Sequence, residues 1–293
     1  MASKYKKEAK ASSFKNQKQS YDQDYGLSAA KPDMEEIVYS SEYERHMAIL
    51  HEWQTMRHTI EAETRDQAKS EKWIAYRRKL LTASNFGKIC RLRKDTPRAN
   101  TLKSIMYPQI PNLRSLEYGR ENEANALKQL EDELGIDILP CGLFIDAVVP
   151  YLGATPDGIV DDDIIVEVKC PESAKDLSPA EAIEQLPAIQ CIFRDDEMNK
   201  IHHYYYQVQG QLHITNRQCA LFCLWTPKGM KIVKVPRNDT FWATEMEEKL
   251  KKFYKDCMLP EIIDSRFNRH QPIREPAYIK TGGACTSTQV QSD

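Results

Sequence analysis

Residues 153–170 read GATPDGIVDDDIIVEVKC, and the fold is expected to form around this stretch. Two apolar runs, residues 151–160 and 164–170, lie on either side of three aspartates, and clustered aspartates are typical of a turn. Short apolar runs that are bounded by turn residues indicate strands. The stretch therefore predicts an antiparallel hairpin with its turn at Gly158 and the aspartates 161–163.

Three charged side chains interrupt this apolar hairpin. Because side chains alternate between the two faces of a strand, Glu167 and Lys169 should share one face. Val166 and Val168 should then point to the opposite face, into the core. Asp157 lies at the end of the first strand. The pattern predicts that two carboxylates and one ammonium group meet at one end of the hairpin.

A metal ion would stabilise such a cluster. Charged residues are seldom fully buried unless they are paired, and two inward-facing carboxylates repel each other unless a cation joins them. Mg²⁺, or Mn²⁺ in its place, prefers oxygen ligands, here Asp157, Glu167 and the carbonyl of Val168. A metal site of this kind supports phosphodiester cleavage, with Lys169 acting on the attacking water. Taken singly, Pro-Asp-Gly is usually a turn and Glu-x-Lys a solvated strand face.

Outside the hairpin, the hydrophobic periodicity alternates between helix and strand. This order predicts an α/β (α+β) fold, a mixed arrangement of layers in one domain. Thr82 or Ser84 is expected to cap a short helix toward Cys90, and Gly135 to end a long one. The expected helices cover about 33–78, 83–90, 115–134, 178–186, 201–215 and 239–258. The expected strands cover 136–146, 151–160, 164–170, 219–227 and 230–236. The remainder of 171–200 is expected to be an irregular loop.

The composition supports the following division of the chain. The first 33 residues are rich in Lys, Ser and Gln and are expected to form a mobile basic arm. A single domain should follow over residues 34–265, with a helical extension at 34–70 and a core at 71–260. Residues 266–293 form a polar tail, of which residues 270–293 are expected to be disordered.

The whole chain can form a sizeable core, because 41% of its 293 residues are apolar. Its net charge of −2 excludes a polycation that coats nucleic acid, although it allows a local basic groove. The chain starts MASKYKKEAK, without an apolar block, and so without a secretory signal. We expect an intracellular protein, nuclear or cytoplasmic. The eight cysteines are scattered and should be reduced, and no histidine pair completes a zinc site beside Cys219 and Cys223.

Several segments together resemble a known family. G-x-T-P-D-G followed by an apolar strand that ends in E-x-K resembles the PD-(D/E)xK nuclease motif, and is most similar to the YqaJ-type viral recombinase and phage lambda exonuclease family. LTAS (81–84) with the upstream Trp73, GRENE (119–123) and YQVQGQL (206–212) match further motifs of that family in the same order. The likeness covers about residues 70–236 and implies a restriction-endonuclease-like mixed sheet flanked by helices.

The resemblance implies a metal-binding role for several residues. Asp157 and Glu167 would bind the metal together with the carbonyl of Val168, and Glu123 would complete the acidic cluster. Some members of the family carry a further acidic residue on the strand after the first core helix, where this chain has Pro140. This departure leaves the number of ions open at one or two.

The resemblance also implies roles in catalysis and in DNA binding. Lys169 would act on the attacking water, and Gln207 would reach the active site from the later helix. Arg77 and Ser84 would receive a 5′-phosphate, and Gln209 of the Q-x-Q helix is assigned to DNA contact. Relatives of the lambda type form rings around DNA, and the resemblance implies that this chain could form a ring trimer.

A basic segment, residues 71–103, suits contacts with phosphates. Arg78, Lys88 and Arg91 are its candidates for DNA binding, and a solvated helix face is the alternative. An aromatic run later in the chain, His202, His203, Tyr204, Tyr205 and Tyr206, could stack on unpaired bases, although packing is the more common role for most of such residues.

These observations predict a Mg²⁺-dependent deoxyribonuclease. The resemblance implies a 5′-to-3′ exonuclease on linear duplex DNA, in recombination, repair or DNA degradation. One alternative is an endonuclease or structure-specific nuclease on the same core. The other is a module that binds DNA ends without cutting them.

Overall fold

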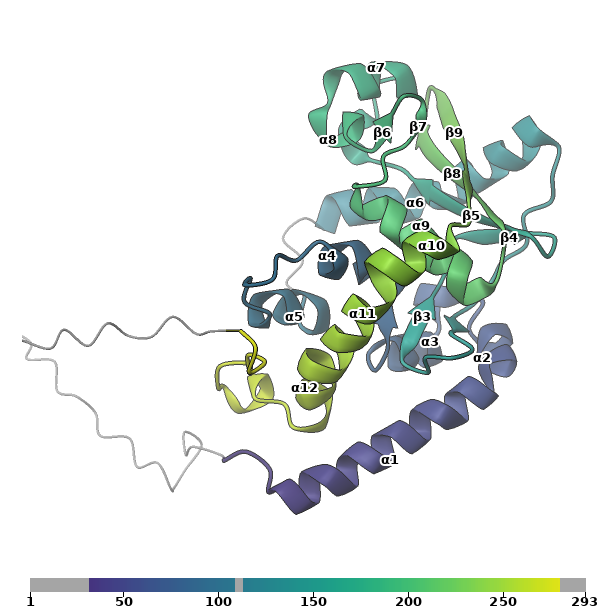
Figure 1. Ribbon diagram of the computed structural model, residues 1–293. Helices are drawn as coiled ribbons and strands as arrows, with labels where there is room; N and C mark the ends of the chain where they lie inside the picture. Colours follow the sequence, from purple (N-terminus) through teal and green to yellow (C-terminus); the bar gives the residue numbers. More distant parts are fainter. Residues whose placement is uncertain (1–31, 109–112, 280–293) are drawn as a thin grey trace, which may run out of the picture. The chain divides into compact units, whose positions relative to one another are not determined.

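The computed structural model describes residues 32–108 and 113–279 and has a mixed α/β architecture (Figure 1). Contacts within the chain separate Met1–Asp33 from Met34–Asp293, and every described helix and strand lies in the second unit. Residues 1–31 of the expected basic arm lie outside the described residues, as do residues 280–293 of the expected tail. The proposed division into helical extension, core and tail stays a prediction.

Three sheets are present in the described residues. The central sheet has the order β4-β5-β8-β9, in which β5 and β8 are parallel and the two outer pairs are antiparallel. A second sheet has the order β1-β3-β2, and β6 and β7 form a small hairpin. The strands are β1 (Leu81–Thr82), β2 (Phe144–Ile145), β3 (Leu152–Ala154), β4 (Gly158–Val160), β5 (Ile164–Lys169), β6 (Phe193–Arg194), β7 (Glu197–Met198), β8 (Cys219–Thr226) and β9 (Gly229–Pro236).

Helices precede and follow the central sheet along the chain. The predicted helix at 239–258 forms, with two π-helical stretches at Trp242–Met246 and Tyr254–Met258. The α-helices are α1 (Glu36–Thr55), α2 (Arg57–Glu63), α3 (Glu71–Arg77), α4 (Phe86–Cys90), α5 (Ala99–Met106), α6 (Leu113–Leu134), α7 (Pro179–Gln185), α8 (Pro187–Gln190), α9 (His203–Thr215), α10 (Asp239–Phe241), α11 (Glu247–Phe253) and α12 (Leu259–Ile263).

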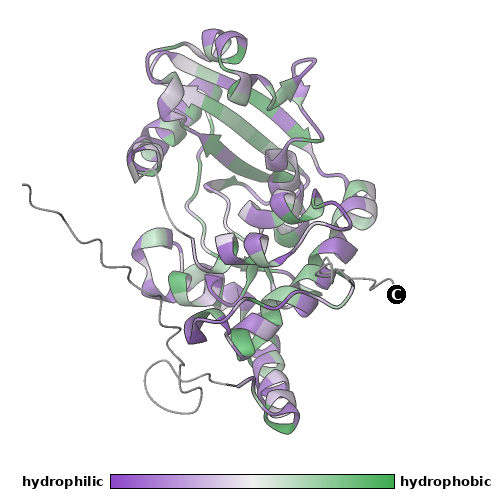
Figure 2. Ribbon diagram, turned by 90° about the vertical axis from the view of Figure 1, so that its left-hand side faces the viewer, coloured by the Kyte–Doolittle hydropathy of each residue, from purple (hydrophilic) through white to green (hydrophobic). Residues whose placement is uncertain are grey.

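The central sheet is covered on both faces. On one face, Val166 and Val168 of β5 pack with Ala126 and Leu130 of α6. On the other face, residues of β5 and β8 pack with α7, α8 and α9. Figure 1 shows α6 and α9 beside this sheet, and Figure 2 shows its strands mostly in the green of apolar residues. Burial on both faces explains why β5 and β8 are almost continuously apolar in sequence.

Local sequence signals explain where several elements begin and end. Gly135 has φ +64°, a conformation that glycine adopts readily, and it ends α6 as predicted. Ser178 and Glu181 form a capping box around Pro179 at the start of α7. Asn216 ends α9 in the left-handed conformation.

The strand predictions hold for β5, β8 and β9, but residues 151–160 are not one strand. They divide into β3 and β4, which belong to different sheets, because Thr155, Pro156 and Asp157 leave the strand between them. Proline lacks the N–H that a continued ladder needs. The predicted strand at 136–146 is also largely wrong, since only β2 and an isolated bridge at Leu139 form there.

Two further expectations are corrected. Neither Thr82 nor Ser84 caps the helix toward Cys90; their hydroxyl oxygens lie 3.2 Å apart instead. The residues around α7 are not an irregular loop, since α8 and the β6–β7 hairpin form there and bury Ile189, Ile192 and Met198.

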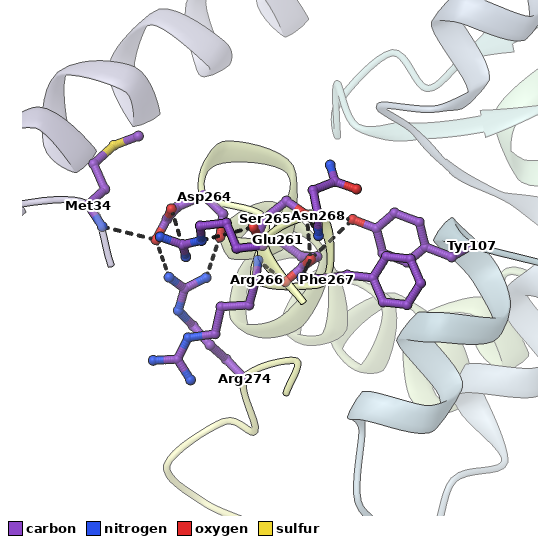
Figure 3. A network of polar contacts seen from close by, with 10 residues as sticks. Met34, Tyr107, Glu261, Asp264, Ser265, Arg266, Phe267, Asn268 and Arg274 are labelled. Carbon is purple, nitrogen blue, oxygen red and sulfur yellow. Dashed lines mark hydrogen bonds and ion pairs between the residues drawn. The ribbon is translucent and has the colours of Figure 1, made fainter. Parts of the chain in front are cut away.

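The residues that follow α12 are attached to the body by a network of polar contacts (Figure 3). The buried Asp264 carboxylate accepts hydrogen bonds from the Met34 N–H (3.2 Å) and the Arg274 guanidinium. Glu275 accepts hydrogen bonds from the backbone N–H groups of Arg98 and Ala99 at the start of α5. The expected disorder of the tail is therefore wrong for residues 270–279.

The described residues hold no helix that is both long and apolar enough to cross a membrane. The seven cysteines in the described ranges are free thiols, and Cys219 and Cys223 are buried on β8.

Candidate active site

The end of the β4–β5 hairpin brings three charged residues together. The Val168 N–H donates to Asp157 Oδ2 at 2.7 Å, and the Asp157 N–H donates to the Val166 carbonyl at 3.0 Å. Lys169 Nζ donates to Glu167 Oε1 on the same strand. As the strand period predicts, Glu167 and Lys169 share the face opposite Val166 and Val168.

Long-range contacts hold the Thr155–Asp157 segment that carries the aspartate. The Pro156 carbonyl accepts hydrogen bonds from Gln67 Nε2 at 3.1 Å and from the thiol of Cys141. Thr155 Oγ1 accepts hydrogen bonds from Trp73 Nε1 (3.2 Å) and Arg77 Nη1 (3.3 Å). The family-like N-terminal residues Trp73 and Arg77 are thus brought directly to the segment that holds Asp157.

Two glutamines of α9 hold the Glu167 carboxylate, which is 2% exposed. Gln207 Nε2 donates to Oε1 and Gln211 Nε2 donates to Oε2, both at 2.6 Å. Gln207 therefore reaches the site as predicted. Gln209 does not, because its amide group is bonded to the Pro236 carbonyl and the Asn238 N–H. The predicted DNA contact of Gln209, which is 1% exposed, is corrected on this evidence.

Sequence reasoning missed Gln211. Residues four apart lie on the same face of a helix, whereas residues two apart do not. The i, i+4 spacing of Gln207 and Gln211 was the signal that could have identified the second glutamine, and the Q-x-Q motif pointed to Gln209 instead.

A cavity of about 370 Å³ opens at this end of β5. Glu123 of α6, Asp157 and Lys169 face it, and so does Tyr204 at the start of α9. The ring of Tyr204 lies 5.0 Å from Lys169 Nζ, close enough for a cation–π contact. The remaining lining residues are Ser115, Leu116, Gly119, Arg120, Val168, Cys170 and Pro171. Pro140, by contrast, is exposed and does not line this cavity.

The electrostatics of the cavity favour a bound cation. Burial and the neighbouring Glu167 raise the pKa of Asp157 well above its ordinary value, and the same two causes raise the pKa of Glu123. Burial lowers the pKa of Lys169, but Glu167 and Asp157 raise it by more, so Lys169 is held as a cation. Both shifts mean that the ionised carboxylates are disfavoured here, first by burial and then by the Glu167 charge, and a bound cation would favour them.

The residues present fit a divalent metal ion by their chemistry. Asp157, Glu123 and Val168 all face the cavity and offer the oxygen atoms that Mg²⁺ prefers. Glu167 lies behind them, with both carboxylate oxygens already bonded to Gln207, Gln211 and Lys169. This explains why no three Asp, Glu, His or Cys side chains among the described residues are arranged around one point as a metal cluster.

The predicted DNA-binding residues differ in their positions. Arg77 is partly buried, stacks on Trp73 at 4.2 Å and has its pKa lowered to about 10 by burial. Ser84, Arg78, Lys88 and Arg91 are exposed. Together with burial, the charges of Arg91, Lys169 and Lys88 lower the pKa of His203, which places Lys88 and Arg91 near the start of α9.

The start of α9 also depends on the close approach of its backbone to α4. A Cβ atom at Gly87 would lie 2.6 Å from the backbone of His203, so only glycine allows α4 to pack this closely. Of the aromatic run, Tyr205 and Tyr206 are buried, and Tyr204 alone of the three tyrosines lines the cavity.

Comparison with solved structures shows the same fold elsewhere. An alkaline exonuclease, LHK-Exo from Laribacter hongkongensis, superposes with a TM-score of 0.52 at 23% identity, covering 69% of this chain and 97% of that one. The same exonuclease in complex with dAMP gives a TM-score of 0.51 at 22% identity, covering 66% and 94%. No curated protein matches the sequence.

Comparison with protein families gives one match. The model of the YqaJ-like viral recombinase domain matches residues 72–218, half of the chain. That range includes every residue that lines the cavity and both glutamines that hold Glu167. This chain belongs to the family of the YqaJ-like viral recombinase domain.

Proposed function

We propose that this protein is a metal-dependent deoxyribonuclease that digests linear duplex DNA. The observation that carries the proposal is the convergence of Asp157, Glu123 and Lys169 on one cavity. The raised pKa values of the two carboxyl groups, caused by burial and by Glu167, agree with a site that a cation completes. A divalent ion bound there would neutralise charge on a phosphodiester and supply a nucleophilic water.

Each residue of the site has a task in this proposal. Asp157 and Glu123 present oxygen atoms to the metal, and the two glutamines fix the Glu167 carboxylate behind them. Lys169 lies at the cavity wall as a cation, where it orients the attacking water and offsets phosphate charge. Tyr204 provides a ring, 5.0 Å from Lys169 Nζ, on which a terminal base can stack.

The finer proposal is a 5′-to-3′ exonuclease. The structural likeness to a protein described as an alkaline exonuclease supports exonuclease activity. Arg77, held next to the Thr155–Asp157 segment, supports capture of a 5′-phosphate beside the cutting site. A role in recombination agrees with the description of the family, and assembly into a ring trimer is proposed from the lambda-type resemblance alone.

The proposal is tested with 5′-phosphorylated linear duplex, by measuring nucleotide release in Mg²⁺ and in EDTA. We expect release in Mg²⁺, with Mn²⁺ as an effective substitute, and none in EDTA. Equal release in EDTA would contradict the metal site, and no release in either would contradict nuclease activity. A duplex labelled at one 5′ or one 3′ end reports the direction of digestion.

Closed circular DNA distinguishes the alternatives. An exonuclease leaves a circle intact, an endonuclease cuts it, and an end-binding module binds linear duplex without cutting either substrate. Only the first outcome agrees with the finer proposal.

Gln211→Ala is expected to reduce turnover by about 10- to 100-fold, the usual cost of removing a hydrogen bond from the groups that support a metal site. Gln209→Ala is the matched control, because it removes a buried glutamine of the same helix that does not touch Glu167. The control should lower the melting temperature and leave the turnover of the folded protein unchanged. Equal turnover losses in the two variants would show that Gln211 acts only through helix stability.

A further inference from the structure

A second cavity, of about 700 Å³, lies at the C-terminal end of α9. Its walls come from α2, from residues 144–148, and from the last turn of α9 with the residues that follow it. Asp162 of the β4–β5 turn and Arg237 complete the lining. It shares no lining residue with the active-site cavity. Because α9 has thirteen residues, its two ends are about 20 Å apart at about 1.5 Å per residue.

Arg217 is the unusual residue of this second cavity. Arg217 is 9% exposed, and its Nε atom is buried without a hydrogen-bond partner. Among the described residues, no carboxylate forms an ion pair with its guanidinium, which lies 5.6 Å from the ring of Phe144. A buried guanidinium without an anion in ion-pair contact is costly, so the position indicates a ligand that supplies the negative charge.

The acidic residues of the same cavity are already engaged or exposed. Glu61 is paired with Arg65 at 2.9 Å and accepts a hydrogen bond from the Gly142 N–H. Burial raises the pKa of Glu61, but these hydrogen bonds and the charges of Arg65 and Arg217 lower it by more, although Glu61 forms no ion pair with Arg217. Asp146 accepts hydrogen bonds from two backbone N–H groups and lies 3.4 Å from His213 Nε2. Asp162 is exposed in the β4–β5 turn. None of the three is thus placed as a dedicated partner for Arg217.

Arg57 provides a second guanidinium on the α2 wall. It donates to the Gln54 carbonyl at 3.3 Å and, like Arg217, has no carboxylate partner among the residues with described structure. A third arginine, Arg237, is paired with Asp239. Phe144, Ile145 and the exposed Val148 form an apolar wall beside these cations.

We propose that this cavity binds a phosphate-bearing ligand, held by Arg217 and Arg57 and lying against the apolar wall. The planar fork of a guanidinium matches phosphate with two parallel hydrogen bonds. A cavity of this size accepts a ligand as large as a nucleotide. The phosphate comes either from a free nucleotide or from the backbone of DNA bound at a distance from the active site. The inference stands on residues outside the active site and does not depend on nuclease activity.

The test measures binding without turnover, with the full chain in EDTA. Inorganic phosphate and dTMP are titrated by calorimetry into the parent, Arg217→Gln and Arg57→Gln. Arg45→Gln is the control, because Arg45 is an exposed arginine of α1 paired with Glu42. We expect each cavity variant to weaken binding by about tenfold or more, the contribution of a charged hydrogen bond, and the control to have no effect.

The NMR signals of the histidine side chains show where the ligand binds. His58 and His213 line the second cavity, whereas His202 and His203 lie at the other end of α9. Phosphate should shift the signals of the first pair in the parent and not in Arg217→Gln. If the Arg217 variant unfolds, Arg57→Gln carries the test alone, since Arg57 is only partly buried.

Anisotropy of a labelled duplex distinguishes the two sources of phosphate. A loss of duplex affinity in Arg217→Gln indicates a DNA backbone phosphate, and a loss of dTMP affinity alone indicates a free nucleotide. Three results would overturn the proposal: phosphate affinity that persists in both variants, shifts confined to His202 and His203, or no binding of any phosphate probe together with unchanged duplex affinity.

Discussion

Lys169→Ala is expected to lower kcat for duplex digestion by about 10³-fold, within the 10²- to 10⁴-fold range of a group that acts on the attacking water. The reason is its position: Lys169 is held as a cation at the wall of the cavity by Glu167 and Asp157. DNA affinity should survive, because the exposed basic residues Lys88 and Arg91 are unchanged. Turnover is measured as nucleotide release in Mg²⁺, and affinity as duplex anisotropy in EDTA.

Lys128→Ala is the matched control, since Lys128 is an exposed lysine of α6 that pairs with Asp132 away from the cavity. It should digest DNA at the parent rate. Circular dichroism checks that the Lys169 variant is folded, because Lys169 is bonded to the buried Glu167. A folded Lys169→Ala variant that cuts normally would show that the active site has been assigned to the wrong residues.

Asp157→Asn is expected to abolish most turnover and, in the absence of divalent ions, to stabilise the protein at pH 8. The pKa of Asp157 is raised in the folded state by burial and by Glu167, so the folded protein holds this proton more tightly than the unfolded chain does. Stability from such a group is fully present below the unfolded pKa and is lost as the pH rises through the folded pKa. Asparagine carries no charge, and its side-chain oxygen can still accept the hydrogen bond from the Val168 N–H.

The measurement is the melting temperature of parent and variant between pH 4 and pH 8 in EDTA. The advantage of the variant should grow as the pH rises, and Mg²⁺ should raise the melting temperature of the parent more than that of the variant. Asp162→Asn, in the exposed turn of the same hairpin, should change neither stability nor turnover. A variant that is less stable than the parent at pH 8 would contradict the raised pKa of Asp157 in the folded protein.

Local periodicity predicted a large part of the site. The alternation along β5 was enough to place Glu167 and Lys169 on one face and their valine neighbours in the core. Gly135 was enough to predict where α6 ends. The order of the motifs indicated the family that the comparison identifies. These features depend on neighbours in the chain, and backbone geometry repeats in the same way wherever the strand or helix lies.

Contacts between distant elements needed the tertiary structure. The three-residue motif Q-x-Q pointed to Gln209, yet the packing of α9 against β5 turns Gln211 toward Glu167 and leaves Gln209 bonded to the end of β9. The division of residues 151–160 into two sheets likewise depends on Gln67 and Trp73, which bind the segment between them from elsewhere in the chain.

By itself, the sequence determined the strand that carries Glu167 and Lys169, the turn at residues 161–163 and the family, whereas Gly158, also predicted in that turn, lies in β4. The tertiary structure alone decided which α9 glutamines hold Glu167, how Arg77 meets Thr155, and that Arg217 is buried without a carboxylate partner among the described residues. The physical reason is that side-chain direction along a strand or helix follows from backbone geometry, whereas a partner across a layer is set by how whole elements pack together.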